Sequence, residues 1–463
     1  MAYQIAPERR LAYRLIVFVV AVVSAVGFGL LAASNPRNGA EMQAEDRLAR
    51  LAPTPARGDV VLVALDAASV GRHGPVKSWP RALLAAGLRR VEAGKPKAVV
   101  LDLALDKRTH MGDEALWRVM ANGRNVVLGM AYDAARRPPY TADDVRAWRF
   151  LQKFAFASGL TFGPQTQVFP YLAFEPPVSD FTGSSRGVGV FDRETDPDGV
   201  VRDARLFYLS VVQEPNPLPR LPGKFPPSLL ADGVPVALPN LALVAGQRVF
   251  NLDKDYVTIR ANYTVHLAGN LNPPVDAPVD EQGRMQIRYA GPAGHDTTYS
   301  FDDVAAGKVK PEVFRDKVVL FGATAPGDPA TDLRATPFGA MPRVEVTANA
   351  LQTLMDRSYF ELVTTRRDHT LGTMILVGLA VGLILMLLSR WQALLAALLL
   401  ALAYVALCWA VLVWGHALLP LLPGLLAILL TLLVALALSL GPFRAVTVPI
   451  SPTYVPPPRS AVR

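Results

Sequence analysis

Five polar side chains are the first candidates for chemistry, because each follows an apolar segment typical of a buried strand or lies on the loop or helix after one. They are Asp66, Arg81, Asp102, Thr324 and Asp332. Ligands bind beyond the carboxyl ends of the strands in an open parallel sheet. We therefore expect these residues to line one acidic crevice that holds a cation or a polar ligand. In the alternative interpretation, Asp66 and Asp332 cap helices or turns and Arg81 pairs with one of them.

A second carboxylate cluster consists of Asp192, Asp196 and Asp198, followed by Gly199. Several carboxylates closed by a glycine are typical of calcium loops. The spacing differs from that of an EF-hand, however, and no bidentate Glu follows at the required distance. The cluster is therefore a weak metal candidate, and an Asp-Gly hairpin turn is the alternative.

Residues 183–187 fit the G-x-S-x-G pattern of a hydrolase nucleophile elbow, with Ser185 as the nucleophile. That elbow needs a strand before it and a helix after it, whereas residues 188–191 have the composition of a strand. The six His residues show no paired metal spacing, and no P-loop, kinase or cyclase signature is present. We therefore predict no catalytic residue, no enzymatic activity and no cofactor.

The elements that must position these residues alternate between strand and helix. Short β-branched segments at 60–65, 98–103, 125–130 and 317–321 predict buried strands, and helical spacing at 84–91, 112–121 and 344–357 predicts helices. Such alternation indicates a parallel sheet covered by helices on both faces. Between about residues 135 and 300 the pattern changes to short alternating segments with Pro and Gly, such as 187–191, 205–212 and 256–267, which predict β-rich insertions.

Four apolar segments without Asp, Glu, Lys or Arg explain the mean hydropathy of +0.26 and the 51% of hydrophobic residues. They are residues 15–34, 371–388, 391–415 and 417–440. Each has roughly the ~20 residues that a membrane-spanning helix needs, so we predict a transmembrane bundle of four helices. The first segment is longer than a signal-peptide core, which favours an uncleaved anchor over a cleaved signal peptide.

Basic residues near the span ends predict the orientation. They place the N-terminus (1–14), the loop at Arg390 and the tail (441–463) in the cytoplasm, and residues 35–370 outside, although Arg37, Arg366 and Arg367 disagree. Residues 35–58 are polar and suggest a stalk that extends the first span. The single cysteine, Cys408, lies in the third span, so the outer domain has no disulfide of its own. The net charge of +8 is scattered along the chain, which argues against nucleic-acid binding.

Small residues recur at four-residue spacing in two of the predicted spans. Ala21, Ala25 and Gly29 lie in the first, and Gly378 and Gly382 form a G-x-x-x-G in the second. Such stripes let helices approach closely, and the alternative is coincidence in Ala- and Gly-rich helices. The absence of charged groups from the middle of the spans argues against transport. The tail carries Pro456, Pro457 and Pro458 and predicts either an extended docking segment or a disordered end.

Taken together, four sequence features resemble the extracytoplasmic CHASE sensor domain of type 2, which is found in bacterial membrane receptors. They are a strand ending at Asp66; Trp79-Pro80-Arg81 before the strand 98–102; Gly187 onward with 196–202; and residues 316–325 with Asp332, Thr336-Pro337 and Ala348-Asn349. The resemblance spans most of residues 45–360 and includes the layout of one membrane helix before the domain and three after it. It implies an α/β extracytoplasmic sensor domain in a bacterial inner membrane.

Two departures from that family are visible. This chain has Arg343 where the family usually has Gly, and Thr347 at a position that is often His. Only residues 441–463 follow the fourth predicted span, so we expect no cytoplasmic output domain of the kind that this family carries. We therefore expect a non-catalytic transmembrane sensor that signals to a separate partner protein, with a homo-oligomer as a further candidate assembly. The alternative is a structural or scaffold subunit of a cell-envelope complex.

Overall fold

The computed structural model describes residues 7–34, 39–51, 58–109, 111–136, 141–156, 167–212, 234–260, 264–271, 273–360, 363–415 and 417–440. The predicted Pro-rich tail, 441–463, lies outside the described residues. The chain forms two compact units: residues 45–363 make up one, and residues 1–44 together with 364–463 make up the other.

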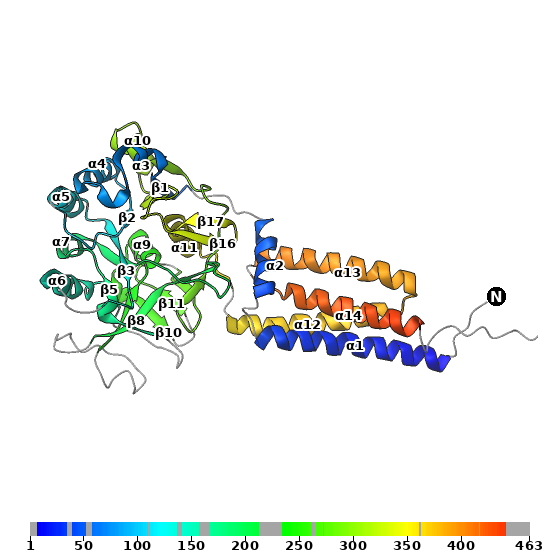
Figure 1. The fold of residues 1–463 in the computed structure, drawn as a ribbon. Coiled ribbons are helices and arrows are strands. Elements are labelled where there is room, and N and C mark those ends of the chain that lie inside the picture. The colour runs from blue at the N-terminus through cyan, green and yellow to red at the C-terminus, as the bar shows by residue number, and fades with distance from the viewer. Residues whose placement is uncertain are drawn as a thin grey trace, which may run out of the picture. The chain divides into compact units, whose positions relative to one another are not determined.

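The first unit is a mixed α/β domain around a largely parallel sheet (Figure 1). The strand order is β14-β1-β15-β2-β3-β5, and β6 also pairs with β3; only β5 runs antiparallel to its neighbour. The strand bounds are β1 Val60–Leu65, β2 Ala98–Asp102, β3 Val126–Tyr132, β5 Phe174–Glu175, β6 Gly187–Val190, β14 Thr298–Ser300 and β15 Val318–Ala323. The predicted parallel-sheet core is thus present.

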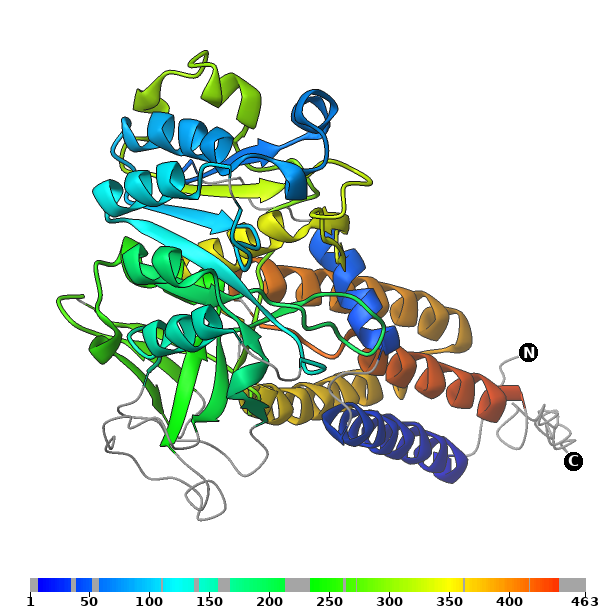
Figure 2. The same cartoon turned by 60° about the vertical axis from the view of Figure 1, so that its left-hand side comes forward.

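Both faces of this sheet are buried, which explains why its strands are continuously apolar rather than alternating. In β1, Val61 and Val63 face one hydrophobic core, and Val60 and Leu62 face the other. Helices α4, α5 and α10 cover the first face and α9 and α11 cover the second (Figures 1 and 2). Their bounds are α4 Arg81–Glu92, α5 Asp113–Gly123, α10 Phe301–Ala305, α9 Leu241–Val249 and α11 Arg343–Asp356.

The β-rich insertions predicted between about residues 135 and 300 form the small separate sheets β4-β8-β9, β10-β11-β12 and β13-β7, and a further two-stranded sheet, β16-β17, follows β15. The prediction was wrong for residues 187–191, because β6 there pairs parallel with β3 and belongs to the main sheet. The strands of the small sheets are β4 Val168–Pro170, β7 Asp203–Arg205, β8 Phe207–Val212, β9 Val234–Pro239, β10 Val257–Arg260, β11 Thr264–Leu267, β12 Val275–Pro278, β13 Arg284–Gln286, β16 Leu333–Thr336 and β17 Gly339–Pro342. Short helices α3 Ala67–His73, α6 Ala142–Leu151 and α7 Ser179–Ser184 and the 3-10 turns η1 Val76–Ser78, η2 Tyr171–Ala173, η3 Lys254–Tyr256 and η4 Pro311–Phe314 complete the domain.

The second unit contains α1 Pro7–Ser34, α12 Val363–Leu385, α13 Arg390–Ala410, which continues into the π-helical segment Val411–Gly415, and α14 Leu421–Leu440. In the described part of the chain, three helical segments are long and apolar enough to cross a membrane: Leu11–Ser34, Trp391–Trp414 and Leu421–Ser439. The apolar part of α12, His369–Leu385, is shorter, because the helix begins among polar residues and ends at Leu385. A bundle of four spanning helices therefore remains a prediction.

The predicted stalk contains a separate helix, α2 Gly39–Arg50, rather than an extension of α1, which ends at Ser34. The division between the two units falls within α2, after Ala44. In the second unit, the Glu41 carboxylate accepts hydrogen bonds from the backbone N–H groups of Leu421 (2.5 Å) and Leu422 (2.9 Å) at the start of α14. A carboxylate at a helix N-terminus satisfies free N–H donors and complements the helix dipole.

Candidate functional site

Three of the predicted crevice residues follow neighbouring strands at the carboxyl edge of the sheet. Strand β15 lies between β1 and β2, with Leu65 beside Ala323 and Gly322 beside Asp102. Asp66, Thr324 and Asp102 therefore end three adjacent strands. The backbone N–H of Thr324 donates to the Leu65 carbonyl (3.1 Å), which joins two of these strand ends.

A partly buried ion network occupies this edge and contains Asp102 and Asp332 of the predicted set. The Arg343 guanidinium donates to Asp102 (Nε–Oδ1 2.9 Å) and to Asp332 (Nη1–Oδ2 3.1 Å), and the Thr347 hydroxyl donates to the other Asp102 oxygen (3.2 Å). The Arg343 guanidinium also lies 4.0 Å from the centre of the Phe191 ring. Burial acts to lower the pKa of Arg343, but the two carboxylates outweigh it and raise the pKa. The cation between the carboxylates is thus supplied by the chain itself.

The packing of α11 explains why Arg343 reaches this position. Strand β17 ends at Pro342, and α11 begins at Arg343, beside the start of β16. Gly322 in β15 allows the close approach, since a Cβ atom there would lie 2.4 Å from the Val344 Cβ. The two residues that depart from the family pattern, Arg343 and Thr347, therefore both contact Asp102.

Asp66 and Arg81 have other partners. Asp66 is the N-cap of α3 and accepts a hydrogen bond from the Ser69 backbone N–H (2.9 Å), as the capping alternative for this residue describes. Arg81 lies 3.9 Å from Asp113, rather than pairing with Asp66 or Asp332. Burial lowers the pKa of Arg81, and Asp113 opposes that shift.

Two of the three weak metal candidates pair with one arginine side chain. Asp196 and Asp198 both accept hydrogen bonds from Arg202 (2.8 and 2.9 Å), which also pairs with Asp46 of α2 (2.7 Å). Asp192 lies apart and accepts the backbone N–H groups of Glu194 and Arg205. Among the described residues, no group of three or more His, Cys, Asp and Glu side chains is arranged to hold a metal ion.

Residues 196–199 form a turn, in which the Gly199 N–H donates to the Asp196 carbonyl (2.8 Å). Gly199 has φ = +81°, a conformation that favours glycine. Residues 196–199 therefore adopt a turn closed by Asp198-Gly199, as the alternative to a calcium loop predicted.

The Ser185 motif lies between a helix and a strand in the order opposite to a nucleophile elbow. Helix α7 precedes Ser185, and β6 follows it at Gly187. The Ser185 hydroxyl donates to the Thr182 carbonyl (3.0 Å). No described His, Asp or Glu side chain is hydrogen-bonded to this hydroxyl, so the geometry offers no base to activate it.

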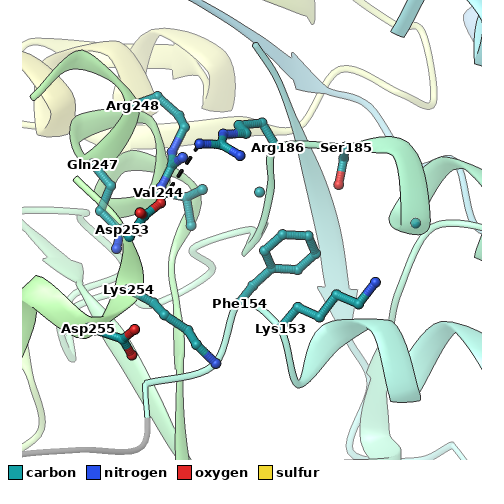
Figure 3. Close-up of a pocket in the computed structure, with 12 residues that line it drawn as sticks. Lys153, Phe154, Ser185, Arg186, Val244, Gln247, Arg248, Asp253, Lys254 and Asp255 are labelled. Carbon is teal, nitrogen blue, oxygen red and sulfur yellow. Dashed lines mark ion pairs between the residues drawn. The ribbon is translucent and has the colours of Figure 1, made fainter. Parts of the chain in front are cut away.

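A cavity of about 360 Å³ lies beside this motif, at the amino end of β6 (Figure 3). Helix α9, the turn η3, the segment after α6 and the residues between α7 and β6 line it, and it is open to solvent on one side. Gly187 allows α9 to approach the strand, because a Cβ atom there would lie 2.3 Å from the Val244 side chain. The cavity is lined by Lys153, Phe154, Gly183, Ser185, Arg186, Gly187, Val244, Gln247, Arg248, Asp253, Lys254 and Asp255.

The lining of this cavity is rich in cations and hydrogen-bond donors. Arg186 and Asp253 form an ion pair at 3.8 Å (Figure 3). Gln247 is 3% exposed, and its Nε2 has no hydrogen-bond partner among the described residues. Burial lowers the pKa of Arg248, the charge of Arg186 adds to this, and Asp253 opposes it. Such surroundings favour a negatively charged occupant.

The small residues predicted for helix packing lie at a contact between α1 and α12 within the second unit. A Cβ atom at Gly378 would lie 2.8 Å from the Ala25 Cβ and 3.1 Å from the Ala21 carbonyl oxygen. A Cβ atom at Gly382 would lie 3.2 Å from the Ala21 Cβ, and one at Gly29 would lie 3.0 Å from Met374. All five predicted positions therefore belong to one helix–helix contact.

Sequence reasoning missed the residues of the cavity. Gln247 and Arg248 lie on α9 and Lys254 begins η3, in a part of the chain for which the sequence predicted only β-rich insertions and no helix. Arg186 lies within the G-x-S-x-G pattern, but that pattern proposes Ser185, and not Arg186, as the functional residue. At the carboxyl edge of the sheet, the sequence identified Arg343 only as a departure from the family pattern. The structure adds that its guanidinium pairs with Asp102.

A protein-family model described as the CHASE2 domain matches residues 17–384 of the chain. The match includes the whole α/β domain, most of α1 and nearly all of α12. No curated protein and no solved structure was found to match the chain.

Proposed function

Because the chain belongs to the CHASE2 domain family, a family of sensory extracellular domains, we propose that it is a non-catalytic transmembrane sensor. In this proposal the α/β domain lies outside the cytoplasmic membrane of a bacterium and detects a ligand or a protein. The signal passes through the apolar helices to a separate partner protein. The family match over residues 17–384 is the observation that carries the proposal.

The chain connectivity supports this role. The polypeptide passes between the two units twice, once within α2 and once between Val363 and Thr364. The α/β domain is therefore connected through the backbone to α1 at one end and to α12 at the other, so a conformational change in the domain can act on both helices. These two helices pack through small residues, which let their backbones approach closely.

The test is affinity purification of the intact protein from its native membrane in mild detergent, followed by mass spectrometry of proteins and small molecules. Membranes without the tagged chain, and a tagged unrelated membrane protein, serve as controls. We expect a kinase, a cyclase or another signalling regulator to co-purify. A stoichiometric set of envelope proteins without any signalling protein would contradict the sensor proposal and would favour the scaffold function.

A further inference from the structure

The cavity beside β6 contains buried donors that have no acceptor. The Gln247 Nε2 and the Arg248 Nε atoms are both buried and have no hydrogen-bond partner among the described residues. Buried polar groups in folded proteins are nearly always hydrogen-bonded, because an unsatisfied donor costs about 1–3 kcal/mol. Both side chains line the same cavity (Figure 3). Arg248 already donates from Nη2 to the Leu252 carbonyl, so its Nε and the Gln247 amide are the donors left without an acceptor in the described part of the chain.

The net positive charge of the lining also favours an anionic ligand. Four basic side chains, Lys153, Arg186, Arg248 and Lys254, outnumber the two acidic ones, Asp253 and Asp255. The 3.8 Å separation of Arg186 and Asp253 is a loose pair that leaves hydrogen-bonding capacity on the guanidinium. Lys254 donates to the Gln152 carbonyl at 3.4 Å and so has donors to spare.

The size and the walls of the cavity indicate an organic molecule rather than an inorganic ion. A volume of about 360 Å³ is within the range of small-molecule sites, which begins at ~300 Å³. Phe154 and Val244 provide apolar wall, and Gly183 and Gly187 expose backbone. A bare ion would leave this wall and most of the volume unused.

We propose that this cavity binds a small organic carboxylate, held by Gln247, Arg248 and Arg186. The carboxylate oxygens accept hydrogen bonds from the amide and guanidinium N–H groups, and the carbon skeleton packs against Phe154 and Val244. This inference rests on the proposed sensor function, because it names the ligand class of that sensor.

The test is isothermal titration calorimetry of the full-length protein in detergent at constant ionic strength. Succinate, citrate and L-aspartate are the carboxylate probes, and inorganic phosphate is the carbon-free comparison. We expect at least one carboxylate to bind, and Arg186→Gln to raise its Kd by about tenfold or more, as loss of a charge-assisted hydrogen bond predicts. Arg118→Gln, an exposed arginine on α5, is the matched control and should leave the Kd unchanged.

Gln247→Leu provides a second variant that separates binding from folding. It removes an unsatisfied buried amide, so the ligand-free protein should melt at the same temperature as the wild type or above it. Its affinity for the carboxylate should nevertheless fall. Absence of carboxylate binding, binding of phosphate alone, or equal affinity of the wild type and Arg186→Gln would each overturn the proposal.

The calorimetry tests the ligand class and the co-purification tests the sensor function, so one result can be negative while the other is positive. Carboxylate binding without a signalling partner would keep the cavity assignment and contradict the proposed function. A signalling partner without carboxylate binding would keep the sensor and refute this ligand class.

Discussion

The Arg343 guanidinium takes the position in which a ligand cation would lie between Asp102 and Asp332. The Asp102 side chain is 1% exposed, and Arg343 provides its ion pair. Removing one partner of a buried ion pair leaves an uncompensated charge and is strongly destabilising. A ligand cation between these two carboxylates would therefore have to displace the internal salt bridge.

Arg343→Ala should lower the free energy of unfolding of the α/β domain by about 3–5 kcal/mol. Urea unfolding of the full-length protein in detergent, followed by tryptophan fluorescence, measures this. Arg334→Ala is the control, because Arg334 pairs with Asp332, which keeps Arg343 as a partner; its effect should be about 1 kcal/mol or less. Equal losses in the two variants would show that Asp102 does not depend on Arg343.

Glu92 gives the domain a pH-dependent stability. Burial raises the pKa of its carboxyl from 4.5 to about 7, against the opposing hydrogen bond from Asn125, and its Oε1 has no partner among the described residues. The folded protein then holds this proton more tightly than the unfolded chain does. The associated stability is complete below about pH 4.5 and is lost as the pH rises through about 7.

Glu92→Gln should therefore be more stable than the wild type at pH 8 and similar to it at pH 4.5. We expect the difference to grow by roughly 1–2 kcal/mol over this interval, after allowance for partial exposure. Urea unfolding at a series of pH values measures it, and Glu114→Gln, on the exposed side of α5, is the control. If the free energies of unfolding of the wild type and Glu92→Gln differ by the same amount at every pH, the raised pKa of Glu92 is contradicted.

At the scale of elements, the contact between α1 and α12 depends on glycine at one position. A side chain at Gly378 would meet Ala25 and the α1 backbone, whereas nothing lies within 4 Å of a Cβ atom at Gly372 in the same helix. The two glycines thus form a matched pair: one lies in the contact and the other is open.

Gly378→Leu should destabilise the second unit by about 1–3 kcal/mol, because added volume in a packed contact forces the helices apart. Gly372→Leu should have little effect. The reaction of a thiol-specific fluorogenic maleimide with Cys408 during heating reports this unfolding, since Cys408 is the only cysteine and is buried. Equal melting temperatures for the two variants would argue that α1 and α12 do not pack through Gly378.

At the scale of the whole molecule, the membrane topology depends on α12. Its apolar segment, His369–Leu385, is shorter than the three other candidates. Four spans place the α/β domain on one side of the membrane and Ser389, the loop before α13, on the other. The side on which Ser389 lies therefore distinguishes a spanning α12 from one that does not span.

Labelling of introduced cysteines with a membrane-impermeant maleimide in spheroplasts tests this arrangement, and the native, buried Cys408 gives a low background. Arg118→Cys, in the α/β domain, should be labelled from outside. Ser389→Cys and Ser460→Cys should be labelled only after the membrane is permeabilised. External labelling of Ser389→Cys would show that α12 does not cross.

The local elements were predictable, because they depend on short-range patterns. Continuous apolar segments predicted β1, β2, β3 and β15, since a strand buried on both faces has no polar side. Helical spacing predicted α4, α5 and α11 in the same way. The family resemblance, carried by motifs with a fixed order along the chain, is confirmed by the match over residues 17–384.

The arrangement of these elements depended on contacts between residues distant in sequence. No local pattern inserts β15, with residues 318–323, between β1 and β2, and that insertion brings α11 and Arg343 onto Asp102. The cavity likewise combines residues between 153 and 255 whose types are ordinary and whose proximity arises only when α9 packs on Gly187. The sequence by itself determined the elements and the family, because both follow from local composition and order. The tertiary structure decided which charges meet, because ion pairs and cavities depend on distances that the chain order does not contain.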